Sequence, residues 1–120
     1  MFIKKIVWLN QEVQEAELYV SDGIKSIICF SHPCQYSEND QLFENLEILD
    51  VSDIRLSDED VYCFERVGDT FEYLVTGRLE NDRSVLVVGE FKINIPTNEI
   101  PGDLQDGMFI KVRISRIDVW

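Results

Sequence analysis

One short turn signal constrains the fold of this chain more than any other feature. Residues 15–20 alternate apolar and polar side chains, Asp22-Gly23 follows, and residues 24–30 are rich in β-branched and aromatic side chains. Asp-Gly between two such runs predicts a β-hairpin, because a type I′ turn needs two residues that tolerate a positive φ. Residues 15–34 are therefore expected to form an antiparallel hairpin.

The two faces of this hairpin differ in polarity. Side chains alternate between the faces of a strand, so a turn centred on the Asp-Gly pair places Leu18 opposite Ile27 on an apolar face. The other face carries Ile28 and Phe30, which a lone sheet would leave in water. A second layer, a barrel wall or a partner must cover them. Homodimerisation through unmatched Ile28, Phe30 and Trp120 is one way to do so.

Most of the remaining chain also follows strand patterns. Alternating or apolar-rich runs predict further strands at residues 1–9, 46–56, 61–67, 71–79, 84–93 and 108–120. Polar loops are expected at 35–45 and 96–107. The alternation of apolar and polar side chains shifts by one residue at Ile48-Leu49 and again at Ser115-Arg116. We call these shifts phase slips, and they predict bulges or bends. Gly77 inside a strand marks a bend or a close backbone approach.

These strands lead to one fold class. A chain of 120 residues with 45% hydrophobic content is long enough for one domain with its own core. Short strands, frequent turns and almost no helical periodicity predict a single all-β domain over 1–120, either a small antiparallel barrel (OB-like, partly open) or a β-sandwich, with little or no helix. Residues 1–9 carry apolar side chains on both faces, as a strand covered on two sides would.

The N-terminal segment and the apolar runs also bear on location. No run approaches the roughly 18 to 20 apolar residues that a membrane-spanning helix needs. The first residues are basic and apolar, but they lack the extended apolar region and small-residue cleavage site of a signal peptide. The expectation is a cytoplasmic protein with no membrane partner.

Charge is the strongest functional signal. The formal net charge is −12, from 11 basic and 23 acidic residues, and residues 1–60 hold four basic and thirteen acidic positions. Such a field repels phosphate backbones and speeds encounter with basic proteins. It predicts a non-enzymatic acidic interaction module, such as a bacterial immunity or inhibitor protein that masks a basic partner like a nuclease toxin. The predicted partner-binding surface comprises the carboxylates Glu44, Glu47, Asp50, Asp53, Asp58, Glu59 and Asp60.

The cysteines and the one histidine suggest two alternatives. Cys29, His32, Cys34 and Cys63 have the ligand count of a closed structural zinc site, which would make this a zinc-stabilised module. Their spacing is poor for zinc knuckles, so no metal or other cofactor is predicted. A Cys34 nucleophile at an exposed strand exit, with His32 as its base, is the enzymatic alternative. It is not favoured, because no third orienting group and no glycine-rich oxyanion loop accompany the pair.

The last predicted strand offers an alternative of opposite charge. Lys111 and Arg113 share a face with Phe109, and basic residues interleaved with an aromatic are ingredients of an OB-like module that binds single-stranded nucleic acid. Cross-strand pairing with Glu72 or Glu90 explains these cations equally well. In a protein with a net charge of −12, a nucleic-acid partner is not expected.

Overall fold

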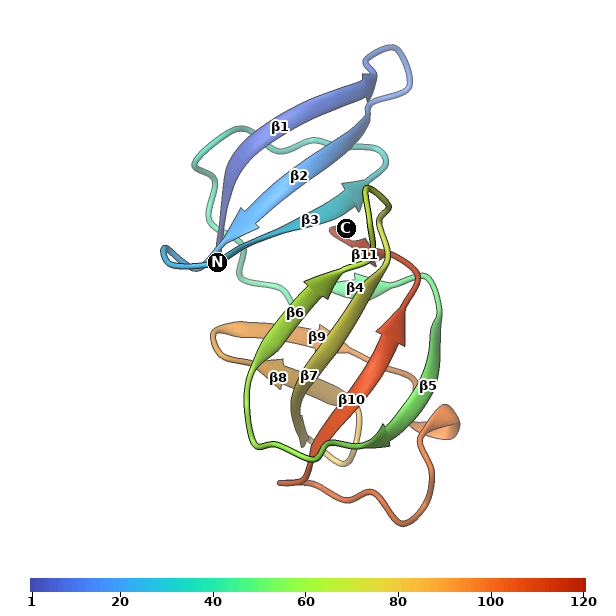
Figure 1. Cartoon of the computed structure of the whole chain (residues 1–120). Coiled ribbons are helices and arrows are strands. Elements are labelled where there is room, and N and C mark those ends of the chain that lie inside the picture. Colours follow the sequence, from blue (N-terminus) through green and yellow to red (C-terminus); the bar gives the residue numbers. More distant parts are fainter.

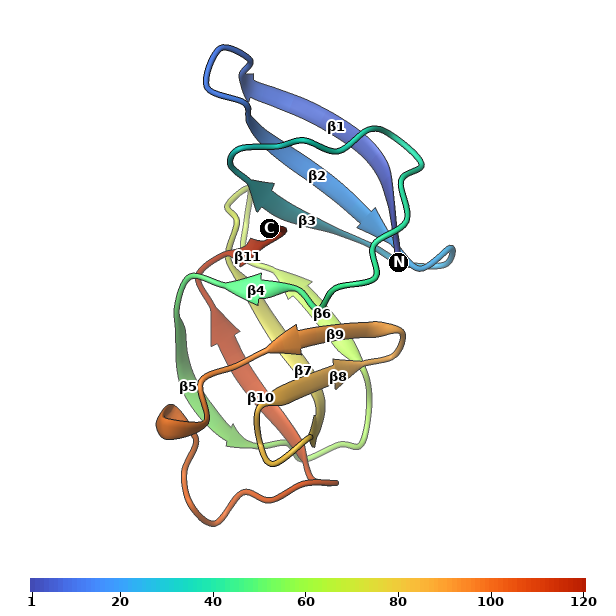
Figure 2. The ribbon, with the colours of Figure 1, turned by 180° about the vertical axis from the view of Figure 1, so that it is seen from behind.

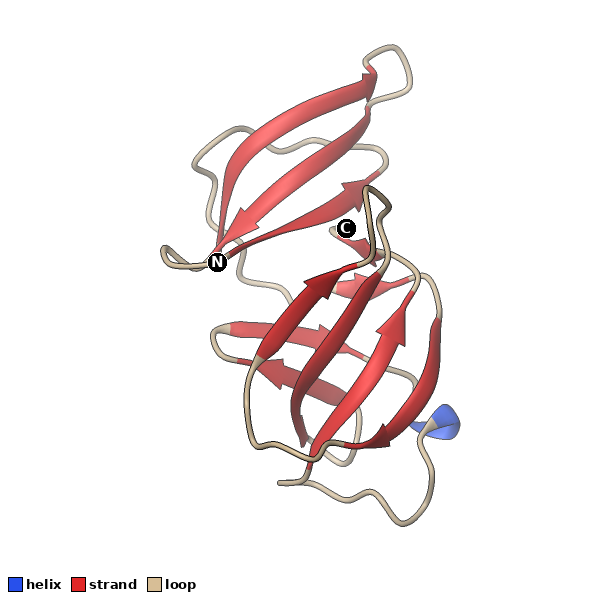
Figure 3. Ribbon diagram, viewed as in Figure 1, coloured by secondary structure: helices blue, strands red, loops and turns tan.

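The computed structural model describes residues 1–120 and is built almost wholly from strands (Figure 1, Figure 3). The strands are β1 (Phe2–Asn10), β2 (Glu15–Ser21), β3 (Ser26–Ser31), β4 (Glu47–Ile48), β5 (Val51–Leu56), β6 (Cys63–Arg66), β7 (Tyr73–Glu80), β8 (Val85–Val88), β9 (Phe91–Asn94), β10 (Phe109–Ile114) and β11 (Ile117–Asp118). One 3-10 helix, η1 (Thr97–Glu99), is the sole helical element, and no helix has the length and apolarity to cross a membrane. The all-β prediction is confirmed.

The strands form two sheets that are not closed into a barrel. One sheet has the order β1-β2-β3-β11-β4, and the other has the order β5-β10-β7-β8-β9 with β6 also paired to β7. All pairs are antiparallel except β11 with β3. A cluster of 25 buried side chains draws on both sheets. Of the two predicted architectures, the arrangement is that of a partly open β-sandwich, with extents of 45 × 26 × 24 Å.

The chain crosses between the sheets at the two predicted phase slips. β4 continues into β5 through Leu49 and Asp50, and β10 continues into β11 through Ser115 and Arg116. The two crossings lie side by side, because the N–H of Leu49 donates to the carbonyl of Arg116 and the N–H of Ser115 donates to that of Asp50. The apolar phase changes at these points because the strand leaves one sheet and joins the other.

The register of the first hairpin differs from the prediction. Leu18 lies opposite Cys29 rather than Ile27, because the turn is a four-residue loop over 22–25 instead of a two-residue type I′ turn. The Asp22 carboxylate accepts hydrogen bonds from the backbone N–H groups two and three residues further on, which stabilises the longer loop. The shift is two residues, so the predicted faces survive although the pairing was wrong.

Two other strand predictions are corrected. Residues 84–93 do not form one strand but the hairpin β8–β9, in which Gly89 adopts a φ of +61°. The first strand is not covered on both faces, since Trp8 and Leu9 are exposed near its end, and it is an edge strand of its sheet. Alternation alone does not distinguish an edge strand with apolar tips from a central one.

The second layer over the first hairpin is the other sheet. Ile28 is buried, and its N–H donates a 2.9 Å hydrogen bond to the hydroxyl of Tyr73 in β7. The Phe30 ring meets Phe71 edge-on, with centroids 5.8 Å apart. Ile28 and Phe30 are therefore covered by the same chain and are not free for the suggested homodimer contact. Of the three residues suggested for that contact, only Trp120 is strongly exposed.

The Tyr73 hydroxyl is expected to stabilise the contact between the sheets. Tyr73→Phe leaves the buried N–H of Ile28 without an acceptor, which costs about 1 to 3 kcal/mol of unfolding free energy. Urea unfolding at 25 °C measures this loss. Tyr62→Phe, at a more exposed tyrosine, is the control and should change the unfolding free energy by less than about 0.5 kcal/mol. Equal stability of the two variants would contradict the role of this hydroxyl.

Candidate interaction surface

The seven predicted carboxylates lie along β4, β5 and the segments that flank them (Figure 1). All seven are exposed or half-buried. Strands rise about 3.3 Å per residue, so the six residues of β5 separate its two ends by roughly 20 Å. The carboxylates therefore form two groups with Asp53 between them. We call Glu44, Glu47 and Asp50 the crossing group, and Asp58, Glu59 and Asp60 the turn group.

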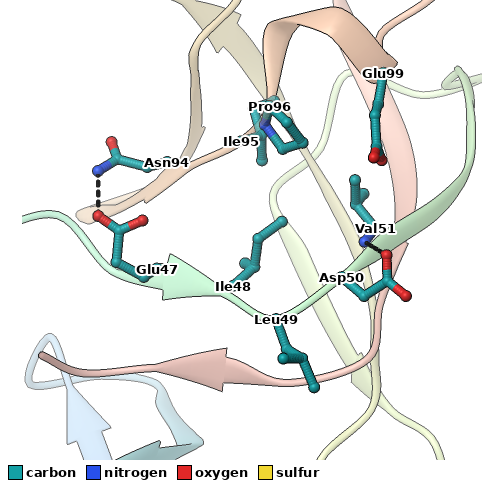
Figure 4. Close-up of a pocket in the computed structure, with 9 residues that line it drawn as sticks. All are labelled: Glu47, Ile48, Leu49, Asp50, Val51, Asn94, Ile95, Pro96 and Glu99. Atoms are coloured by element: carbon teal, nitrogen blue, oxygen red, sulfur yellow. Dashed lines mark hydrogen bonds between the residues drawn. The ribbon is translucent and has the colours of Figure 1, made fainter.

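A hollow of about 470 Å³ opens beside the crossing group (Figure 4). It is lined by Glu47, Ile48, Leu49, Asp50, Val51, Asn94, Ile95, Pro96 and Glu99. Figure 4 shows the carboxylate of Glu47 on one side of this hollow and those of Asp50 and Glu99 on the other. Glu99 belongs to η1 and was not predicted as a site residue, because nothing local links a loop carboxylate to a strand some fifty residues earlier.

β4 lies beside β9 (Figure 2), and a hydrogen bond from β9 holds Glu47 of the crossing group in place. The Nδ2 of Asn45 donates to the Oδ1 of Asn94 at 2.9 Å, and the Nδ2 of Asn94 donates to the Oε1 of Glu47 at 2.8 Å. The backbone of Leu46 makes two hydrogen bonds to β9. Its N–H donates to the carbonyl of Lys92, and its carbonyl accepts from the N–H of Asn94. The Glu47 carboxylate is thus positioned by one neutral donor, the Asn94 amide, which Asn45 in turn orients.

No ion pair neutralises the predicted surface. The protein contains three ion pairs, which are Arg78–Glu80, Arg113–Glu72 and Arg116–Asp118. None of them includes a residue of the crossing group, a residue of the turn group or Asp53. Their negative charge therefore faces the solvent without an ion-pair partner from the same chain.

The structure does not bring the proposed zinc ligands together. Cys29 lies in β3 within the core, whereas Cys63 lies in β6 of the other sheet, opposite Thr76. No three His, Cys, Asp or Glu side chains gather in a way that could hold a metal ion. Burial raises the pKa of the Cys29 thiol far above its ordinary value, with a smaller contribution from Asp118. The raised pKa keeps this thiol protonated near neutral pH, as is usual for a cysteine buried in a core.

The thiol and imidazole of the enzymatic alternative lie in different environments. Cys34 is buried with 2% exposure, whereas His32 is exposed. The expectation of an exposed Cys34 thiol was therefore wrong. The cause is the strand exit after β3, where the Cys34 N–H donates to the carbonyl of Gln14 and the side chain joins the core.

The basic strip on β10 is occupied by its own neighbours. Arg113 pairs with Glu72, as the cross-strand alternative predicted, and this hydrogen bond lowers the pKa of the Glu72 carboxyl. The Phe109 ring lies against Tyr62 with centroids 5.3 Å apart. Lys111 lines a hollow together with carboxylates of the turn group. Of the predicted basic strip, Arg113 and Phe109 therefore already have partners within the same chain.

Comparison with known proteins adds a family but no activity. The model of one protein family, described as Uncharacterised conserved protein UCP019853, matches residues 1–120. No curated protein and no solved structure matches the chain.

Proposed function

This chain belongs to the family of Uncharacterised conserved protein UCP019853, and we propose that it is a non-enzymatic acidic protein that docks onto a basic site of a protein partner. The observation that carries the proposal is the absence of any ion pair on the predicted surface of a protein with a net charge of −12. Cations of a partner would supply the ion pairs that the chain itself does not form there.

Docking should gain most of its binding free energy at the hollow beside Glu47, Asp50 and Glu99. A charge pair 4 Å apart is worth about 1 kcal/mol in bulk water and about 4 kcal/mol near a protein surface of lower effective dielectric. A partner that fills this hollow of about 470 Å³ excludes water from the carboxylates around it. The crossing group should therefore contribute to affinity, while the exposed turn group mainly steers the encounter.

A nuclease toxin is the kind of partner that suits this surface. A nuclease must present basic residues to bind phosphate groups, and an acidic protein that covers those residues excludes the nucleic acid without any chemistry of its own. We propose an immunity or inhibitor protein of this kind. Its location would be the cytoplasm, where the free thiols of Cys29, Cys34 and Cys63 remain reduced.

Neutralising the central carboxylates tests the proposal. The triple variant Glu47→Gln, Asp50→Asn, Asp53→Asn should associate with the basic partner about tenfold more slowly at low salt, because steering depends on charge. Its fold should persist, since the glutamine amide oxygen still accepts from Asn94 and asparagine tolerates the φ of +50° of the third position. The difference should shrink at 1 M salt, where the Debye length falls to about 3 Å.

The measurement needs a defined partner and a matched control. Immobilised protein retains the partner from the native lysate at low salt, mass spectrometry identifies it, and stopped-flow mixing of the purified pair gives the rate. The control, Glu12→Gln, Asp69→Asn, Glu90→Gln, removes the same charge from three other exposed turns. An association rate that is unchanged in the first variant, or lowered as much in the control, would refute the proposal.

A further inference from the structure

Two aromatic side chains project into solvent next to the crossing group. Phe43 is 91% exposed and Trp120 is 86% exposed, although they lie far apart in the sequence. Both line a hollow of about 210 Å³ together with Tyr36 and Glu44, and both line a second hollow of about 310 Å³ together with Glu44 and Glu47. Aromatic rings and carboxylates therefore meet along one continuous surface.

The backbone under both rings is held in place. The Tyr36 hydroxyl donates to the main-chain carbonyl of Trp120, and the preceding Val119 is buried with its N–H bonded to β3. Phe43 follows the buried Leu42, whose N–H donates to the carbonyl of the first residue. Because the backbone is already held, binding has to restrict only the two side chains and not the segments that carry them.

We propose that the hollow bounded by Tyr36, Phe43 and Trp120 receives an arginine side chain of the basic partner, with Glu44 as its counter-ion. This inference rests on the proposed docking function. It identifies the hollow as the anchor, the place where one side chain of the partner would be held. The hollow is smaller than the roughly 300 to 1,000 Å³ of small-molecule sites, so it suits one side chain. The surface is also continuous with the crossing group, because Glu44 belongs to both.

Arginine fits the chemistry of this hollow better than other side chains. A guanidinium stacks flat on aromatic rings and binds a carboxylate through two parallel hydrogen bonds, whereas a lysine ammonium is a strongly hydrated point charge. The hollow also lies in a negative environment. Burial raises the pKa of the Tyr36 hydroxyl, and Cys34, Glu44 and Asp40 add to the rise.

A single-tryptophan variant reports directly on this hollow. The protein has two tryptophans, so Trp8→Phe leaves Trp120 as the only one. Its fluorescence is titrated with three glycine-serine peptides that carry two arginines, two lysines or two citrullines. We expect a saturable change with the arginine peptide, about fivefold weaker binding of the lysine peptide, and no saturation with citrulline. Equal responses to all three peptides would overturn the proposal.

Variants in the Trp8→Phe background separate this anchor from the rest of the surface. Phe43→Ala with Glu44→Gln should weaken arginine-peptide binding about tenfold, whereas Leu56→Ala, at an exposed leucine on β5, should leave it unchanged. Equal binding by both variants would refute the anchor. If the arginine peptide fails to bind while the Glu47, Asp50 and Asp53 substitutions still slow partner association, only the anchor is wrong. If the peptide binds but those substitutions have no effect, the acidic docking function is wrong.

Discussion

The Phe91→Ala variant is expected to lose about 3 to 5 kcal/mol of unfolding free energy, because truncating a buried phenylalanine removes its burial and leaves a cavity. Phe91 is 1% exposed, and its ring meets that of Phe64 edge-on with centroids 5.2 Å apart. Proteins are stable by only about 5 to 15 kcal/mol in total. A loss of this size is a large fraction of the stability.

The chain offers a matched control for this truncation. Phe43→Ala deletes the same atoms from a side chain that is 91% exposed, and it should change the unfolding free energy by less than about 0.5 kcal/mol. Denaturant unfolding of both variants gives the comparison. Similar losses at the two positions would show that burial of Phe91 does not stabilise the fold. The loss also bears on the interaction surface, because β9 positions Glu47 through Asn94.

Gly77→Ala is expected to destabilise the protein by about 3 kcal/mol, the upper end of the usual overpacking range. A Cβ at this position would lie 2.5 Å from the carbonyl oxygen of Val87 and 2.8 Å from the Cγ2 of Val88. The carbonyl belongs to β8, which pairs with β7 through Arg78 and Val87. It cannot move away without disturbing that pairing, so the strain falls on the sheet.

Gly102→Ala is the control for the Gly77 substitution. Nothing lies within 4 Å of a Cβ at Gly102, and its φ is not in the left-handed region. The unfolding free energy of Gly102→Ala should equal that of the original protein or be slightly higher, because alanine restricts the conformations of the unfolded chain. Thermal unfolding should place the Gly77→Ala midpoint about 12 °C below that of the control, at roughly 4 °C per kcal/mol. Coincident midpoints would contradict the close approach.

Local patterns in the sequence determined the class and the faces of the strands. Alternation placed Leu18 and Cys29 on the core side of the hairpin, and the structure buries both. The phase slips marked the two crossings between sheets, and Gly77 marked the close approach of β8. These features follow from the two-residue period of a strand and from the missing Cβ of glycine, which act over a few neighbouring residues.

Pairing partners depended on more than these local patterns. The carboxylate of Asp22 stabilises a four-residue loop, which moved the hairpin register by two residues. Gly89 turned a predicted strand over 84–93 into a hairpin, and β1 became an edge strand. Several turn geometries and strand orders satisfy the same alternation, and the hydrogen bonds of the folded chain select among them.

Composition alone determined the excess of acidic residues, while the tertiary structure decided what stands around them. It placed Glu99 beside Glu47 and Asp50, left these carboxylates without ion pairs, and brought Phe43 next to Trp120. It also buried Cys29 in β3 and placed Cys63 in the other sheet, so the four candidate zinc ligands do not gather. The physical reason is that these contacts join residues distant in the chain. They form only when the strands and loops have packed together, and no local periodicity encodes that packing.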